Sequence, residues 1–261
     1  MNCRICRSET THVFDGLIMG RHPTEYFRCP RCGFLQTGEP YWLAESYRNP
    51  ITSTDIGMMA RNLRLTELLT AFFYFCADRD GDFLDFGGGY GIFVRLMRDV
   101  GFRFHWEDAH AENWFPLPAE EPPAHYGAVT ALEVFEHLPD PVATLEQLLS
   151  KSGMIVIGTE LIPDSPDADL KDWEYLSVHH GQHISFFSEE TFRYLAARYH
   201  LNRYTDRKSI TVLSERKLGG KADFLLSRRH RTLLFLFEYA KRNLHSLLDA
   251  DHRKLLGDIN P

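Results

Sequence analysis

The 261-residue sequence contains no long apolar run. A helix that crosses a bilayer needs about 20 consecutive apolar residues. The densest apolar stretch, at residues 233–237, is only LLFLF and has basic residues nearby on both sides. The opening residues, MNCRICRSET, contain no apolar segment of the kind that a secretory signal peptide requires. We therefore expect a cytoplasmic protein without a transmembrane segment.

The sequence also lacks internal repeats, low-complexity segments and an overall excess of basic residues. Its formal net charge is −7, divided into −15 for residues 1–190 and +8 for residues 191–261. An acidic main part argues against a general nucleic-acid binder. The basic C-terminal part leaves room for an anionic substrate or partner.

Cysteine is scarce, with five in the chain, but four of them form two C-x-x-C pairs. Such a turn directs two sulfurs to one point, and two turns complete a tetrahedral zinc site. A disulfide or redox pair is the alternative, which a cytosolic location disfavours. The predicted ligands of a structural zinc ion are Cys3, Cys6, Cys29 and Cys32. All four positions are filled by sulfur, so none remains for a metal-bound water. We assign Cys76, in an apolar helical stretch, to the core.

Strand-like and helical patterns alternate from residue 82 to residue 214. This alternation predicts an α/β fold, with a doubly wound and mostly parallel sheet between helices. We divide the chain into a zinc-binding module at 1–40, a connector and helix at 41–80, a main domain at 81–218 and a helical extension at 219–261.

The stretch LDFGGGYG, at residues 84–91, lies between an expected strand and an expected helix. Glycine-rich backbone in this position brings N–H groups and a helix dipole close to a ligand. The dinucleotide fingerprint G-x-G-x-x-G does not fit, because Ile92 stands where the third glycine should be. The pattern present is an acid followed by alternating glycines: Asp85, Gly87, Gly89 and Gly91.

This pattern resembles motif I of the class I S-adenosylmethionine-dependent methyltransferases. Asp108 ends the next expected strand, where the resemblance implies an acid that accepts both ribose hydroxyls of the cofactor. The segment YGAVTALEVFEHLPDP, at 126–141, resembles the fourth-strand segment of a group that includes ubiquinone-biosynthesis and sugar methyltransferases. The residues that match this group one by one are Glu133, Glu136, His137 and, in the later segment HHGQHISFFSEETFRYL, His183.

The resemblance covers residues 82–200 and implies a Rossmann-like methyltransferase domain that binds S-adenosylmethionine. Its implied cofactor contacts are the glycine loop, Asp108 and, through the methionine part, Glu133. His183 is the first candidate for a general base and His137 the second, although either could be an ordinary loop histidine. Glu136 is a further catalytic candidate that could instead cap its loop. The paired cysteines match the zinc module that precedes this domain in the deoxysugar C-methyltransferases.

We therefore predict in-line methyl transfer to a small molecule, for example a sugar or a nucleotide-linked metabolite. One alternative is an RNA or protein methyltransferase that grips its substrate with the zinc module. Residues 1–40 carry five basic and four acidic groups, and a zinc ion with four thiolates adds about two negative charges, which disfavours RNA. A second alternative is a regulator that binds the cofactor without turnover.

Three other features have two interpretations each. Trp42 and Tyr47 either pack between the module and the domain, which we prefer, or form a lid over the cofactor. The C-terminal segment is read as an amphipathic helix that packs on the domain or on a second subunit. Its alternative is a membrane-surface helix, because Arg228, Arg229 and Arg231 flank the apolar run. The oligomeric state and the adenine contacts are not predicted.

Overall fold

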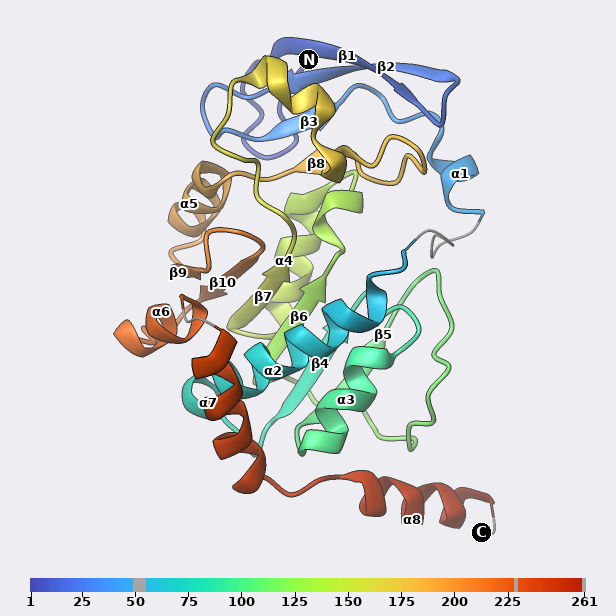
Figure 1. Ribbon diagram of the computed structural model, residues 1–261, viewed down its shortest axis with the longest axis vertical. Coiled ribbons are helices and arrows are strands. Elements are labelled where there is room, and N and C mark those ends of the chain that lie inside the picture. The colour runs from blue at the N-terminus through green and yellow to red at the C-terminus, as the bar shows by residue number, and fades with distance from the viewer. Residues whose placement is uncertain (49–54, 228–229, 260–261) are drawn as a thin grey trace.

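The computed structural model describes residues 1–261 except 49–54, 228–229 and 260–261, and contains two sheets (Figure 1). The larger sheet has six strands in the order β5-β4-β6-β7-β10-β9. Its strands are β4 (Asp82–Phe86), β5 (Arg103–Glu107), β6 (Ala128–Leu132), β7 (Met154–Gly158), β9 (Asn202–Thr205) and β10 (Ile210–Ser214). The pairs among β5, β4, β6 and β7 are parallel, whereas β10 pairs antiparallel with both β7 and β9. The predicted mostly parallel α/β fold is confirmed.

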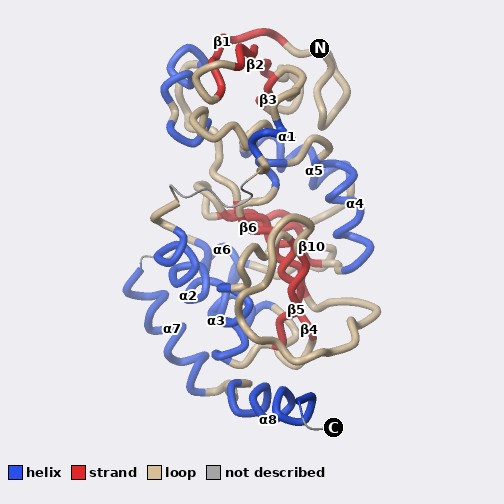
Figure 2. The backbone as a smooth tube through the Cα atoms, turned by 90° about the vertical axis from the view of Figure 1, so that its right-hand side faces the viewer, coloured by secondary structure: helices blue, strands red, loops and turns tan. Residues whose placement is uncertain are grey.

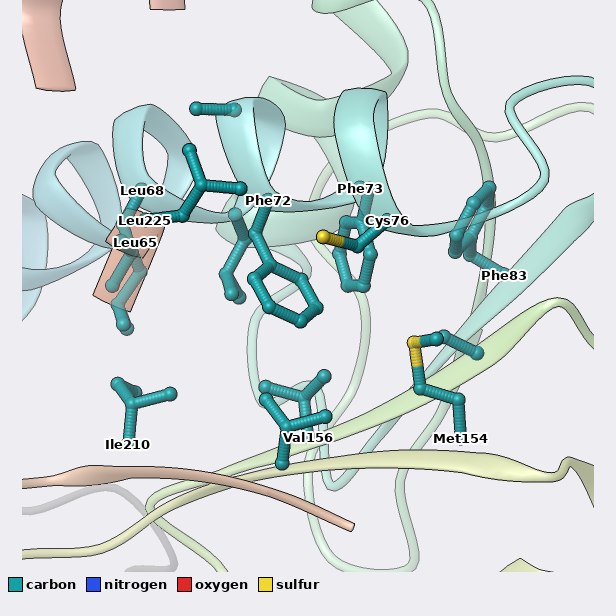
Figure 3. Close-up of a cluster of buried hydrophobic side chains, with 14 of the residues drawn as sticks. Leu65, Leu68, Phe72, Phe73, Cys76, Phe83, Met154, Val156, Ile210 and Leu225 are labelled. Atoms are coloured by element: carbon teal, nitrogen blue, oxygen red, sulfur yellow. The ribbon is translucent and has the colours of Figure 1, made fainter. Parts of the chain in front are cut away.

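Helices cover both faces of the larger sheet (Figure 2). One face carries α2 (Met58–Cys76), α3 (Ile92–Val100), α6 (Gly220–Leu226) and α7 (His230–Arg242). The other face carries α4 (Pro141–Lys151) and α5 (Glu189–Arg198). Side chains of α2 point from the helix toward the sheet, where Phe72 and Phe73 are fully buried above Val156 (Figure 3). Cys76 is buried in the same cluster, as its apolar surroundings predict.

The smaller sheet forms a module at the N-terminal end, at the top of Figure 1. Its strands, in order, are β1 (Thr11–Ile18), β2 (His22–Arg28), β3 (Leu35–Thr37) and β8 (Ser185–Phe186). β8 comes from far along the chain and begins two residues after His183, so the histidine segment supplies a strand to the module's sheet. The short helix α1 (Leu43–Ser46) follows β3, and 3₁₀ helices lie at Phe135–His137, Asp167–Asp172 and Glu174–Leu176.

The expected helical C-terminus consists of α6, α7 and α8 (Leu248–Ile259). Tyr239 of α7 stacks on Phe75 of α2 at a ring-centroid distance of 6.2 Å, so α7 packs on the domain. α8 crosses the end of the domain beside α3 (Figure 1), where Asp251 accepts two bonds from Arg98, at 2.6 and 2.8 Å. Arg228 and Arg229 lie outside the described residues. Within the described ranges, every helix is too short or too polar to cross a membrane.

Candidate active site

The glycine loop joins β4 to α3. Three glycines are in the left-handed region, with φ values of 71° at Gly87, 53° at Gly89 and 81° at Gly91, a conformation that other residues adopt at a cost. A Cβ on Gly87 would lie 2.5 Å from the Val134 side chain, and one on Gly91 would lie 2.2 Å from the Asn113 side chain. Two of the glycines are therefore required by the protein's own packing, and not simply by the approach of a ligand.

Asp85 lies under this loop at the end of β4. Its carboxylate is buried and accepts a 2.6 Å hydrogen bond from the Thr130 hydroxyl. Burial, with a smaller contribution from the nearby Asp108 charge, raises the pKa of Asp85 to about 7. Asp85 therefore anchors the turn as a group that is close to half-protonated at neutral pH.

Asp108 follows β5 and ties the end of that strand to the glycine loop. One carboxylate oxygen accepts from the Gly89 backbone N–H at 2.9 Å. The other accepts from the backbone N–H groups of His110 and Ala111, at 2.7 and 2.8 Å. The carboxylate of the neighbouring Glu107 instead binds the Lys151 ammonium at 2.5 Å. Asp108, rather than Glu107, is thus fixed by the backbone of the loop.

The loop after β6 carries Glu133, Glu136 and His137. Glu133 is itself in the left-handed region, with φ at 57°, and its carboxylate lies 3.8 Å from the Arg61 guanidinium of α2. Burial raises the pKa of Glu133. No sequence signal identified Arg61 as a site residue. α2 precedes the matched motifs, and its helical pattern alone accounts for the residues of this segment.

Glu136 is fully buried behind this loop. One oxygen of its carboxylate, Oε1, accepts a 2.6 Å hydrogen bond from the hydroxyl of Tyr175. Burial, followed by the charge of Glu133, raises the pKa of Glu136 to about 8. The Tyr175 hydroxyl thus holds the Glu136 carboxylate, and Tyr175 is a site residue that sequence patterns did not indicate.

His137 and His183 face each other with ring centroids 4.8 Å apart. The Nδ1 atom of His183 lies 2.7 Å from the backbone oxygen of Tyr175, and that of His137 lies 3.2 Å from the backbone oxygen of Gln182. A carbonyl can only accept, so each Nδ1 carries the hydrogen and each Nε2 carries a lone pair. Burial lowers the pKa of His137 to about 4 and that of His183 well below its usual value. Both rings are therefore neutral at neutral pH.

A cavity of about 940 Å³ connects these groups. The predicted site residues that line it are Asp85, Gly87, Gly89, Asp108, Glu133, His137 and His183. Gly91 and Glu136 lie outside its lining, Gly91 at the start of α3 and Glu136 behind the wall. Tyr47 lines the cavity, whereas Trp42 is buried and donates from its indole nitrogen to the Gly181 backbone oxygen at 2.8 Å. Trp42 thus packs between segments, and Tyr47 faces the site.

The four paired cysteines converge in the N-terminal module, and all are buried. Their sulfurs lie within 4.8 Å of one another, with Cys3–Cys32 at 3.6 Å and Cys6–Cys29 at 3.4 Å. Four sulfurs held at about 2.3 Å from one zinc ion in a tetrahedron are roughly 3.8 Å apart. The donor set therefore fits a four-coordinate zinc ion.

The module is fastened to the segment that carries His183. The guanidinium of Arg4 donates to the backbone oxygens of Ile184, Thr37 and Gly38, at 2.7, 3.0 and 3.1 Å. The Thr191 hydroxyl in α5 donates to the Cys32 backbone oxygen at 2.9 Å. The cysteine turns thus support the strand that follows the catalytic candidate.

A protein-family model described as a methyltransferase domain matches residues 59–204. The chain belongs to this methyltransferase family. The match confirms the predicted enzyme class, an S-adenosylmethionine-dependent methyltransferase, and includes the glycine loop and the histidine segment. No curated protein matches the chain.

Solved structures similar to this methyltransferase include an O-methyltransferase family 2 protein from Planctomyces limnophilus, in complex with apigenin. That match has 12% identity and a TM-score of 0.41, and covers 66% of each chain. A possible histamine N-methyltransferase from Thermotoga maritima matches with 13% identity and a TM-score of 0.41, over 67% of this chain and 100% of its own. The plantazolicin methyltransferase in complex with SAH matches with 12% identity and a TM-score of 0.43, over 68% of this chain and 95% of its own.

Proposed function

We propose that this methyltransferase transfers the methyl group of S-adenosylmethionine to a small-molecule acceptor. One observation carries the proposal: the glycine loop, Asp108, His137 and His183 all line a single cavity. Its volume of about 940 Å³ is near the top of the range of roughly 300–1,000 Å³ that is usual for small-ligand sites. This is room for a cofactor and a small acceptor together.

The part of the cavity that the glycine loop and Asp108 line suits the cofactor. Backbone N–H groups of the loop and the dipole of α3 can approach polar groups of its amino-acid part. Asp108 keeps acceptor capacity for ribose hydroxyls, because a carboxylate has about four lone-pair sites and three backbone donors occupy part of it. We assign Glu133 to the cationic methionine end of the cofactor. S-adenosylmethionine supplies a methyl group on a positively charged sulfur.

The part of the cavity that His137 and His183 line suits the acceptor. Each neutral imidazole has a free Nε2 lone pair, so His183, or His137 as the second choice, can take the proton of a hydroxyl, an amine or an acidic carbon. The Tyr175 hydroxyl, which holds Glu136, orients the carboxylate behind the rings. His183 is buried and His137 is partly buried, and a small molecule reaches such a site more easily than a folded macromolecule does. A sugar or a nucleotide-linked metabolite remains a candidate acceptor.

The N-terminal module is proposed to hold a structural zinc ion through Cys3, Cys6, Cys29 and Cys32, as in the deoxysugar C-methyltransferases. We keep its proposed extent at 1–40, with the connector at 41–80, the methyltransferase domain at 81–218 and the extension at 219–261. The reduced thiols that zinc binding needs agree with the cytoplasmic location that we propose.

Calorimetric titration with S-adenosylhomocysteine tests the cofactor site. We expect one site per chain, and at least about tenfold weaker binding in Asp108→Asn, because the amide loses an acceptor. Asp82→Asn is the matched control, since Asp82, at the start of β4, pairs with Arg103 and His105 and is not part of the cavity lining, and it should bind like the wild type. Absence of binding in the wild-type protein would refute the proposed function. Acceptors are then sought by thermal stabilisation in the presence of S-adenosylhomocysteine.

A further inference from the structure

Two loops that are distant in the sequence bring three metal-ligating groups together, of which the two histidines line the cavity and Glu136 lies behind its wall. One ligand atom from each of Glu136, His137 and His183 lies within 4.8 Å of the others. Glu136 and His137 belong to the loop after β6, and His183 lies two residues before the start of β8. We propose that these three residues bind a divalent metal ion, separate from the cysteine site.

The histidines are oriented as metal ligands usually are. Each ring uses Nδ1 to donate to a backbone carbonyl, at 2.7 Å for His183 and 3.2 Å for His137. A metal-ligating histidine almost always has such an outer partner, which sets the ring orientation and makes the other nitrogen the ligand. Each ring therefore keeps an Nε2 lone pair that can bind a metal ion.

Glu136 supplies an independent observation. Its residue is fully buried, and Oε1 accepts from Tyr175 at 2.6 Å. The second oxygen, Oε2, is also buried and has no hydrogen-bond partner among the residues that the structure describes. A buried carboxylate oxygen without a partner is costly and needs an explanation. A cation bound to Oε2 would remove that cost.

The ligand types indicate which ions fit. Two imidazoles and one carboxylate suit first-row divalent ions such as Mn²⁺, Fe²⁺, Co²⁺ or Zn²⁺, and such a set leaves coordination positions open. The four thiolates of the N-terminal module form a softer site, which disfavours Mn²⁺. Manganese therefore distinguishes the two sites in one protein.

The inference rests on the proposed methyltransferase function and changes the base in it. An acceptor hydroxyl that coordinates the ion loses its proton more readily, and the proton passes to solvent. The oxygen lone pair then forms the bond to the methyl carbon, and the electrons of the broken C–S bond stay on sulfur. His183 would be a ligand and not the base, since the ion occupies its Nε2 lone pair. The acceptor class is then an oxygen nucleophile.

Electron paramagnetic resonance with Mn²⁺, on the full zinc-loaded chain, tests the proposal without any acceptor. We expect one Mn²⁺ per chain and pulsed-resonance couplings to two imidazole nitrogens. Removing an outer partner of a metal site costs roughly 10- to 100-fold in affinity, so the loss of a ligand in Glu136→Gln or His183→Ala should cost at least about 100-fold. His179→Ala is the control, because His179 lines the same cavity but lies outside the cluster, and it should retain wild-type binding.

Wild-type protein without the two nitrogen couplings would overturn the proposal, even if the variants failed to fold. Equal affinity in wild type and in folded Glu136→Gln would overturn it as well. The S-adenosylhomocysteine titration fails or succeeds separately: binding of Mn²⁺ without the cofactor product would remove the proposed function and keep the metal site. Cofactor binding without Mn²⁺ would leave His183 as the base.

Discussion

The buried carboxylate of Asp85 makes stability depend on pH in a direction that can be calculated. Its pKa is about 7 in the folded protein, against a value of 3.8 for an ordinary aspartate. The folded state therefore binds more protons than the unfolded state between these two values, and the free energy of unfolding falls as pH rises through this window. The destabilisation is absent below pH 3.8 and complete above pH 7.

The magnitude follows from the two pKa values. A difference of one pKa unit corresponds to about 1.36 kcal/mol, so the full effect is about 4 kcal/mol. Between pH 5 and pH 8 the same linkage gives a loss of about 2.5 kcal/mol. Asp85→Asn removes this contribution, while the amide oxygen can still accept from Thr130.

The assay is urea unfolding of wild type and Asp85→Asn at pH 5 and pH 8, without cofactor. We expect the stability of the variant relative to wild type to increase by about 2.5 kcal/mol from pH 5 to pH 8. Zinc release and the other titrating groups are common to both proteins, so they cancel in this comparison. A relative stability that stays constant across the window would refute the buried, proton-binding Asp85.

Three further predictions concern the supports of the site. Arg4→Met should lower the free energy of unfolding by about 2–4 kcal/mol, because three backbone oxygens lose a charged donor. Arg7→Met is the control and should leave stability unchanged, since the Arg7 side chain is 69% exposed. Equal urea midpoints for Arg4→Met and wild type would contradict the prediction. Asp251→Asn should cost about 1.5–3 kcal/mol, because the buried Arg98 loses one charged partner, although it keeps Glu120, at 3.0 Å. Asp249→Asn, at an exposed position, should change little. Elemental analysis should find one zinc per chain in wild type and in Cys76→Ala but less in Cys29→Ser; full zinc in Cys29→Ser would argue against the four-cysteine site.

Local patterns were sufficient for most elements of the methyltransferase domain. The helix over 141–151 begins at Pro141 after the cap Asp140, whose side chain accepts from Ala143, and the helix after Ser188 begins with a capping box. Such signals lie within a few residues of each other. The three-residue β3 and the two-residue β8 offer no such pattern, because strands this short exist through their partners.

The sequence by itself determined the chemistry that is present: the four thiols, the acid-led glycine loop, and the glutamates and histidines of the matched segments. Local periodicity was enough to predict the fold class, and the resemblance of contiguous motifs to a known family implied the enzyme class. Tertiary structure decided which groups share a cavity and which protonation state each of them has. It buries Glu136 against Tyr175, turns two Nδ1 atoms to backbone carbonyls, and places Arg61 from α2 beside Glu133. Burial and contacts between distant segments set these properties, and neither is encoded within any single stretch of the chain.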